Sequence, residues 1–286
     1  MKSNIIVLQF PKCAGEEESL EGQNNLSLSY IENSEVVYEG LPCDSHRKER
    51  KMTSTEYVAI ISSALLLDKS VAIGRHFNLL QNPYCANTEP VIDLWPVQFS
   101  NRKSKYPETF TLVLQMGTIL HMTHYWKKLR MRVNIFVDDK TSMLAEKSKV
   151  TEMLMKLRIV AELNVVSLDE MYEKDENVCW TALDIEMQAK VLNSLIRKYS
   201  RNSRVVFTGL PSPPNQGRVG SSFSSQDNVS SDNFYIQESS EEGSSKSDLF
   251  DVRLADAYLE VINEISNDTP PILMIHGNGV VVTTDL

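Results

Sequence analysis

Short apolar runs of strand length alternate along this chain with longer stretches whose apolar residues recur at helical spacing. Between residues 4 and 168 the predicted order is β-α-β-β-α-β-α-β, with Ile5–Leu8 and Met131–Val137 among the strands and Phe110–Met122 as a buried helix. Because strands that alternate with helices usually pair in parallel, this order predicts an α/β fold with a mostly parallel, doubly wound sheet. Ile5–Leu8 is β-branched and is bounded by Pro11, so we expect it to be a central strand.

A second, smaller α/β unit is predicted after residue 170, which divides the chain into two predicted subdomains, 1–170 and 171–286. The length of 286 residues suits two domains, and 42% hydrophobic residues are enough for a sizeable core. The second unit has predicted helices at Leu183–Tyr199 and Phe250–Ile265 and predicted strands at Arg204–Thr208, Ile272–Ile275 and Val280–Thr283, with a tight turn at Gly277-Asn278-Gly279.

A serine-rich segment interrupts this second unit. Ser221–Ser247 holds eleven serines and five acids against one lysine, and it has too few apolar residues to offset its chain entropy. We therefore expect a disordered insert over about 215–248. Three serines lie three residues before an acid, the pattern that acid-directed protein kinases recognise, so candidate phosphorylation sites are Ser224, Ser239 and Ser245. The alternative is a solvated linker with chance matches.

The overall charge argues against a nucleic-acid partner. The formal net charge is −9 and the isoelectric point is near 5.2, whereas nucleic-acid-binding proteins usually present a basic face. The longest uncharged window, Thr109–Trp126, is about half polar, so it predicts no transmembrane helix. The four cysteines are widely spaced and form no C-x-x-C pair, which predicts neither a zinc site nor a disulfide framework and fits a reducing compartment.

No motif of an enzyme active site is present. The chain has no G-x-G-x-x-G after its first strand, no Walker-type phosphate loop and no H-E-x-x-H, so we expect no catalytic residues, no metal site and no enzyme. His121 and His124 share one helical face and could hold a metal, but no third ligand accompanies them, which favours core or interface histidines. Asp138 and Asp139 follow a predicted strand where α/β sheets bind ligands, although two acids at a loop start are commonplace.

A basic cluster precedes the first predicted helix. Its cations gain nothing from the helix dipole, so they are either a solvated loop or a contact for an anionic partner. Such a partner would be the serine-rich segment once phosphorylated, or an anionic membrane face. The candidate contact residues are Arg47, Lys48, Arg50 and Lys51.

A set of short motifs, in order along almost the whole chain, resembles the C-terminal domain of cation–chloride cotransporters, a family of the amino acid/polyamine/organocation transporter superfamily. The ending Val281–Leu286 is most similar to the branch that contains fungal vacuolar cotransporters and the cotransporter-interacting-protein type. The motifs are Asp93-Leu94-Trp95, the apolar stretch Phe110–Met122, Trp126-Lys127-Lys128, Met131-Arg132-Val133, Leu157-Arg158-Ile159, Phe207–Pro214, Tyr258-Leu259-Glu260 and Pro270–Gly277.

This resemblance implies a non-catalytic regulatory domain on the cytosolic face of a membrane, such as the fungal vacuolar membrane. It implies two Rossmann-like subdomains related to universal stress proteins, a homodimer, contact with the protein's own transmembrane domain, and control of K⁺–Cl⁻ transport through a protein kinase. Some members of the family are thought to bind ATP or another adenine nucleotide. No motif here carries such a site over, so the cofactor-binding residues are unknown.

Two other functions remain open from the sequence. A free-standing nucleotide-binding protein of the universal-stress type would explain the sheet but not the Pro-Pro elements, and it predicts measurable ATP affinity. A soluble α/β enzyme would need a cleft with paired titratable groups, and none occurs at motif spacing. The resemblance also leads us to expect a membrane domain encoded upstream of Met1.

Overall fold

The computed structural model describes residues 5–11, 52–81, 89–99, 108–168, 179–214 and 246–277. By its internal contacts the chain forms two units. One is Phe10–Thr53, of which only the two ends are described, and the other comprises Met1–Gln9 and Ser54–Leu286. The helices and strands of the described residues belong to the second unit.

The described strands of this unit form one sheet. They are β1 (Ile5–Gln9), β2 (Ser70–Arg75), β3 (Glu89–Trp95), β4 (Arg130–Val137), β5 (Glu162–Ser167), β6 (Ser203–Gly209) and β7 (Ile272–His276). Their order across the sheet is β1-β2-β7-β6-β3-β4-β5. Every neighbouring pair is parallel except β2 and β7, which are antiparallel. The α/β fold with a mostly parallel sheet is therefore confirmed.

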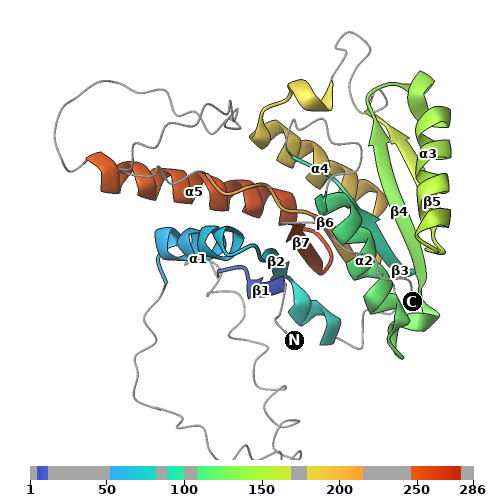
Figure 1. Ribbon diagram of the computed structural model, residues 1–286, viewed down its shortest axis with the longest axis horizontal. Helices are drawn as coiled ribbons and strands as arrows, with labels where there is room; N and C mark the ends of the chain where they lie inside the picture. Colours follow the sequence, from blue (N-terminus) through green and yellow to red (C-terminus); the bar gives the residue numbers. More distant parts are fainter. Residues whose placement is uncertain are drawn as a thin grey trace, which may run out of the picture. The chain divides into compact units, whose positions relative to one another are not determined.

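Helices cover both faces of the sheet (Figure 1). They are α1 (Ser54–Leu66), α2 (Glu108–Met122), α3 (Met143–Lys156), α4 (Ile185–Tyr199) and α5 (Lys246–Ser266). Successive residues of β3 assign the faces, because neighbouring side chains on a strand point to opposite sides. Leu94 lies against Gly117 of α2, whereas the indole N–H of Trp95 donates to Ser200 at the end of α4. Helices α2 and α3 thus cover one face, and α4 covers the other with α5 beside it and α1 beside α5.

The core is built from the apolar strand residues that the sequence pattern predicts. Val91, Ile92, Leu94 and Trp95 of β3 are fully buried, as expected for a strand covered on both faces. The predicted buried helix Phe110–Met122 is confirmed as α2, whose Gly117 lets it approach Leu94 so closely that an added Cβ would lie 2.4 Å from a Leu94 methyl carbon. No helix within the described ranges combines the length and the apolar character needed to cross a membrane.

One expectation about the sheet is wrong. The strand predicted at Ile5–Leu8 forms as β1, but among the described strands it lies at the edge of the sheet rather than at its centre, where it pairs with β2. Val7 is accordingly 64% exposed. A short apolar run indicates a strand but carries no information on which strands flank it, because register and neighbours depend on the rest of the chain.

The two predicted subdomains share this sheet. Strands β6 and β7, from the range 171–286, lie between β2 and β3, from the range 1–170. The boundary near residue 170 stays a prediction about how the chain divides, but it does not separate two sheets.

Some predicted features fall outside the described residues. Residues 215–245 of the expected disordered insert and the expected strand Val280–Thr283 belong to this group. Helix α5 begins at Lys246, so the last three residues of the range given for the insert, 246–248, are helical instead.

Candidate functional site

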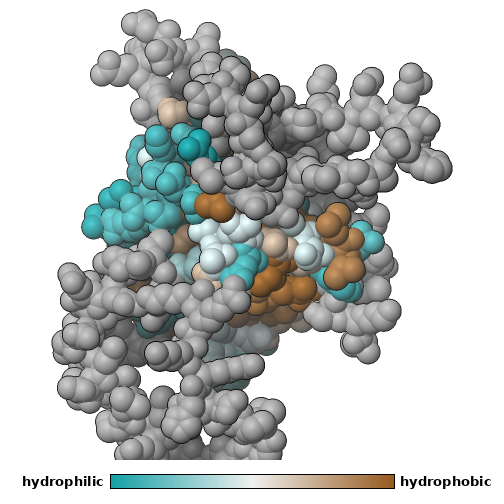
Figure 2. Space-filling view, turned by 90° about the vertical axis from the view of Figure 1, so that its left-hand side faces the viewer, coloured by the Kyte–Doolittle hydropathy of each residue, from teal (hydrophilic) through white to brown (hydrophobic). Residues whose placement is uncertain are grey.

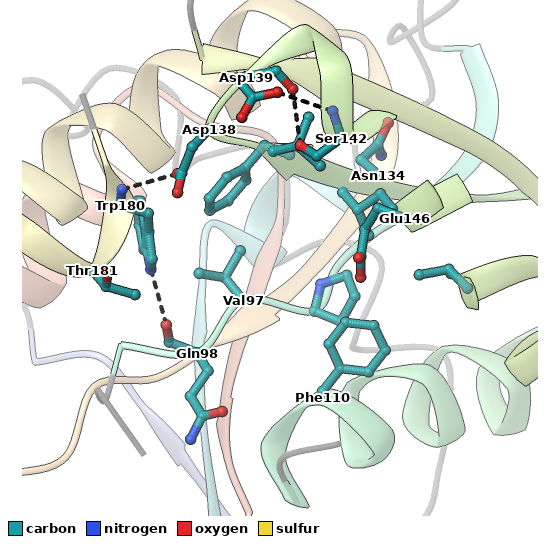
Figure 3. Close-up of a pocket in the computed structure, with 15 residues that line it drawn as sticks. Val97, Gln98, Phe110, Asn134, Asp138, Asp139, Ser142, Glu146, Trp180 and Thr181 are labelled. Carbon is teal, nitrogen blue, oxygen red and sulfur yellow. Dashed lines mark hydrogen bonds between the residues drawn. The ribbon is translucent and has the colours of Figure 1, made fainter. Parts of the chain in front are cut away.

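A hollow of about 400 Å³ lies at the carboxyl ends of β3 and β4. This is the edge of an α/β sheet at which ligands usually bind. Figure 3 shows Trp180 and Asp138 on one side of it and Glu146 and Phe110 on the other. Its lining comes from the loop after β3, from α2, from β4 and the loop after it, from α3, and from the short helical turn Trp180–Ala182.

Trp180 is the most firmly held of these residues. Its backbone N–H donates to the carboxylate of Asp138 at 3.0 Å, and its indole N–H donates to the carbonyl of Gln98 at 3.1 Å. The side-chain amide of Gln188 donates to the Trp180 carbonyl at 2.9 Å, and the ring of Phe136 lies 4.6 Å away between centroids. These contacts fix one wall of the hollow as a rigid aromatic surface.

Asp138 and Asp139 lie at the hollow, where the sequence analysis expects a ligand edge. Asp138 also accepts from the thiol of Cys179 at 3.3 Å. Asp139 accepts from the backbone N–H of Ser142 at 2.9 Å and from the hydroxyl of Thr141 at 2.5 Å. The Thr141 hydrogen bond first, and the Ser142 N–H second, lower the pKa of the Asp139 carboxyl below its usual value. Both acids therefore order the local backbone as well as charging the hollow.

The described lining of the hollow is acidic. Three carboxylates face the hollow, from Asp138, Asp139 and Glu146, and its described lining includes no Lys, Arg or His. A nucleotide triphosphate needs cations or a cradle of backbone N–H groups, and the described part of the lining offers no cationic side chain. Acidic and aromatic walls suit a cationic or uncharged polar group instead.

A buried polar network lies under the hollow. The carboxylate of Asp93 is fully buried and accepts from Arg132 twice, Nε to Oδ1 at 2.7 Å and Nη2 to Oδ2 at 2.8 Å. It also accepts from the amide of Asn134 at 3.1 Å and from the hydroxyl of Ser203. The amide of Asn164 donates to Asn134 at 3.0 Å. The network therefore joins β6, β3, β4 and β5 in one layer.

This network is structural and was missed by the sequence analysis. Every polar atom of Asp93 is satisfied, which is what a buried carboxylate needs to remain stable. Arg132 also donates to the carbonyl of Tyr199 at 3.0 Å, and so ties the end of α4 to the sheet. A signal was present, since Asp93 interrupts the apolar run Val91–Trp95, and charges inside buried strands are usually paired.

His121 and His124, which the sequence analysis considered as metal ligands, make separate contacts in the structure. His121 Nε2 is 2.9 Å from the carbonyl of Leu129, a contact that links the end of α2 to the start of β4. His124 is exposed and meets the ring of Tyr125 edge-on. Among the described side chains, His, Cys, Asp and Glu form no group of three that could hold a metal ion.

The remaining candidate residues fall on parts of the chain that the structure does not describe, and they stay predictions. They are the candidate phosphorylation sites Ser224, Ser239 and Ser245 and the basic cluster Arg47, Lys48, Arg50 and Lys51.

Comparison with known proteins finds transporters. The chain is 26% identical over 261 residues, 86% of its length, to solute carrier family 12 member 9 of Xenopus laevis. It is 24% identical over 83% of its length to the protein of the same name from Danio rerio. It is 31% identical over 144 residues, 46% of its length, to vacuolar cation-chloride cotransporter 1 of Saccharomyces cerevisiae. No protein-family model matches the chain.

The relatives are much longer than the region that matches them. The alignments cover 25%, 24% and 13% of the Xenopus, Danio and Saccharomyces proteins, so this chain spans about a quarter or less of their length. The resemblance seen in the sequence motifs is confirmed: the relatives of this chain include members of solute carrier family 12 and a fungal vacuolar cation-chloride cotransporter.

Proposed function

We propose that this relative of the cation–chloride cotransporters is a cytosolic regulatory and dimerisation domain of such a transporter, of the K⁺–Cl⁻ type. It would tune ion transport by a membrane domain rather than perform chemistry itself. The observation that carries the proposal is the 26% identity over 86% of this chain to one quarter of a solute carrier. Because the match runs through nearly the whole chain, it concerns the fold rather than a single motif.

The fold supports a role in transmitting a signal. Helices cover both faces of one sheet, and the Asp93 network ties four neighbouring strands and the end of α4 together. Such an element moves as a body. Phosphorylation of the serine-rich segment by an acid-directed kinase would add about −1.5 to −2 charge per site, and the membrane domain would sense the change. We place this domain at the cytosolic face of a membrane, the vacuolar membrane in a fungal cell.

Exposed apolar residues support the dimer. β1 is an edge strand, and unpaired strand edges are ready templates for pairing with another chain. Val7 on this strand is 64% exposed, and Leu66 and Leu67 at the end of α1 are 79% and 70% exposed. Figure 2 shows hydrophobic residues gathered on the face of the molecule that it views. Large exposed apolar patches are typical of protein–protein contacts.

The test is ion flux through the native gene product. Cells that express it intact are compared with cells that express it without residues 1–286, and potassium-dependent chloride flux and membrane abundance are measured in both. We expect the truncated protein to reach the membrane but to lose kinase-dependent control of flux. A native product that has no membrane spans and does not purify with membranes would contradict the proposal.

The principal alternative, a free-standing nucleotide-binding protein of the universal-stress type, makes a different prediction. The purified chain would bind ATP, and the acidic lining of the hollow opposes this. Calorimetry with ATP and Mg²⁺ separates the two functions, because saturable binding by the native chain would favour the alternative. An α/β enzyme would instead show turnover that depends on a titratable pair in a cleft.

A further inference from the structure

A basic face lies on the outward side of α4. Ser194, Arg197, Lys198 and Arg201 surround a shallow hollow of about 340 Å³, and all four side chains are exposed. Their spacing of three, four and seven residues places them on one side of the helix and its extension. We call these four residues the α4 basic face. The sequence analysis did not select them.

The cations of this face are only partly neutralised. Arg197 forms an ion pair with Asp268 at 2.8 Å, and the Lys198 ammonium lies 5.2 Å from the centre of the Tyr199 ring. Among the described residues no carboxylate pairs with Lys198 or Arg201. The helix dipole favours cations in the last turn, which accounts for Arg197 and Lys198 but not for Arg201, which follows the helix.

The chemistry of the α4 basic face fits a phosphate group. Two guanidinium groups can each donate two parallel hydrogen bonds to phosphate oxygens, an ammonium adds a third charge, and the Ser194 hydroxyl can donate as well. A phosphate dianion would also relieve the repulsion among cations that lie three and four residues apart.

The position of this face limits which part of the chain can reach it. The Arg197–Asp268 ion pair places the face at the carboxyl end of α5, because Asp268 comes two residues after that helix. Residues 215–245 join α5 at its opposite end, Lys246. A helix of 21 residues is about 31 Å long. A serine in 215–245 therefore needs about that length of chain before Lys246.

This limit separates the candidate phosphorylation sites. An extended chain spans about 3.5 Å per residue, so Ser245 and Ser239 have about 4 and 24 Å of chain before Lys246. Both lengths are shorter than α5. Ser224 has about 75 Å on that side. On its N-terminal side, Ser224 is joined to Pro211 by about 45 Å of chain. Pro211 lies beside α5, because its carbonyl accepts a hydrogen bond from the Tyr258 hydroxyl. Tyr258 is about 12 Å along α5 from Ser266, so the chain on this side of Ser224 is also longer than the distance to be spanned.

We propose that the α4 basic face binds the chain's own serine-rich segment when Ser224 is phosphorylated. Charge complementarity and chain length both favour this occupant, since the segment is acidic, contains the phosphorylation pattern and is tethered within reach. The proposal gives a ligand to the regulatory role proposed above, but its test uses the purified chain and requires no ion transport. Failure of one is thus distinguishable from failure of the other.

The first experiment measures binding in trans. A peptide of residues 219–233 with phosphoserine at position 224 is titrated into the purified, unphosphorylated chain and followed by fluorescence anisotropy. The double variant Lys198→Gln, Arg201→Gln should weaken binding about tenfold or more, because charged hydrogen bonds to phosphate are lost. The matched double variant Lys147→Gln, Arg253→Gln removes two exposed cations elsewhere and should bind as the parent chain does.

The second experiment tests reach within one chain. Phosphoserine is incorporated at position 224 or at position 245, and hydrogen exchange of residues 194–201 is measured. We expect slower exchange with phosphoserine at 224 only. Equal effects at both positions, or unchanged affinity in the Lys198→Gln, Arg201→Gln variant, would overturn the proposal.

Two further outcomes would show that the serine-rich segment, or the α4 basic face, has a different partner. Loss of phosphopeptide binding in a variant with Arg47, Lys48, Arg50 and Lys51 changed to Gln, but not in the α4 variant, would give the segment a different partner. Vesicles that contain one-fifth phosphatidylserine provide the other arm. If the α4 variant loses vesicle binding but keeps phosphopeptide affinity, the α4 basic face contacts a membrane and the proposal is wrong.

Discussion

Arg132 and Asp93 face each other across β4 and β3 and form a two-fold ion pair, with Nε–Oδ1 and Nη2–Oδ2 distances of 2.7 and 2.8 Å. Asp93 is fully buried, and the Arg132 side chain is 21% exposed. The same strand carries a second pair, Arg130–Glu162, at 3.1 Å with side chains 55% and 53% exposed. The chain thus contains a buried and an exposed ion pair two residues apart, which provides a built-in comparison.

Arg132→Met should destabilise the chain by about 3–5 kcal/mol, because it leaves the Asp93 carboxylate buried without its cation. Arg130→Met should cost less than about 1 kcal/mol, because water already screens that pair. Urea unfolding of both variants, followed by circular dichroism, measures the difference. Similar losses of unfolding free energy in the two variants would show that the burial of Asp93 does not determine how much its ion pair stabilises the chain.

Gly209→Ala should destabilise the chain by about 1–3 kcal/mol and disturb the acidic hollow. A Cβ at Gly209 would lie 2.0 Å from the carbonyl oxygen of Val97, a backbone atom in the loop that lines the hollow. Gly74→Ala is the matched control, since its Cβ would lie 3.3 Å from the Phe77 ring, which can shift. Thermal unfolding gives the stability, and the fluorescence of Trp180, measured in a background in which Trp95 and Trp126 are changed to Phe, reports on the hollow.

Tyr258→Phe should cost about 1–3 kcal/mol at neutral pH, because the buried carbonyl of Pro211 loses the hydroxyl that donates to it at 2.9 Å. Burial, and secondarily the nearby Tyr57, raise the pKa of Tyr258 well above its usual value. The unfolded chain ionises this phenol near pH 10 and the folded chain does not, so stability is present below pH 10 and falls above it.

The stability difference between the parent chain and Tyr258→Phe should therefore shrink above pH 10. Urea midpoints at pH 7 to 11 test this. A difference that stays constant across that range would show that Tyr258 ionises equally in both states.

Asp139→Asn should lower the stability of the chain at pH 6 but not at the acid end of the range. The hydrogen bonds from Thr141 and Ser142 lower the pKa of the folded carboxyl, so its contribution is present above the unfolded pKa of about 3.9 and is lost as the pH falls through the folded pKa. Asn at this position can still accept from the Ser142 N–H and isolates the effect of charge. Urea midpoints from pH 2 to 6 should converge for the two proteins at the acid end.

Val7→Lys should weaken the proposed dimer, because it places a charge on the exposed face of the edge strand. Leu144→Lys is the control, since Leu144 is 81% exposed on α3, away from β1. Light scattering over a range of concentrations measures the association. A monomer at high concentration in the parent chain would rule out a dimer contact within residues 1–286.

Much of the fold could be predicted from the sequence, because periodicity is a local signal. The apolar runs at β4, β5 and β6 and the helical stripes of α3 and α4 identify those elements directly. The position of β1 at the edge could not be predicted, because its partners lie outside the run. The positions of β6 and β7 within the sheet could not be predicted for the same reason, since pairing joins residues that are far apart in the chain.

The sites were harder to predict than the elements. Asp138 and Asp139 could be placed at the carboxyl edge of the sheet, because that position follows from the strand before them. Trp180 could not be connected to them, since it lies some forty residues further on and reaches Asp138 only through the fold. The α4 basic face could not be predicted, because it depends on which side of α4 each residue lies and on the position of Asp268 after another helix. Both are known only from the fold.

The antiparallel junction between β2 and β7 gives the sheet a mechanical property. Five residue pairs, from Val71–His276 to Arg75–Ile272, face each other along it. Hydrogen bonds in such a ladder lie across the strands, so a pull on β1 and β2 along their length strains all of them together rather than one after another. Force applied at the first strand would therefore pass undivided into β7 and β6. We therefore expect the sheet to resist such a pull as one stiff body, with most of the load carried by the β2–β7 pairing.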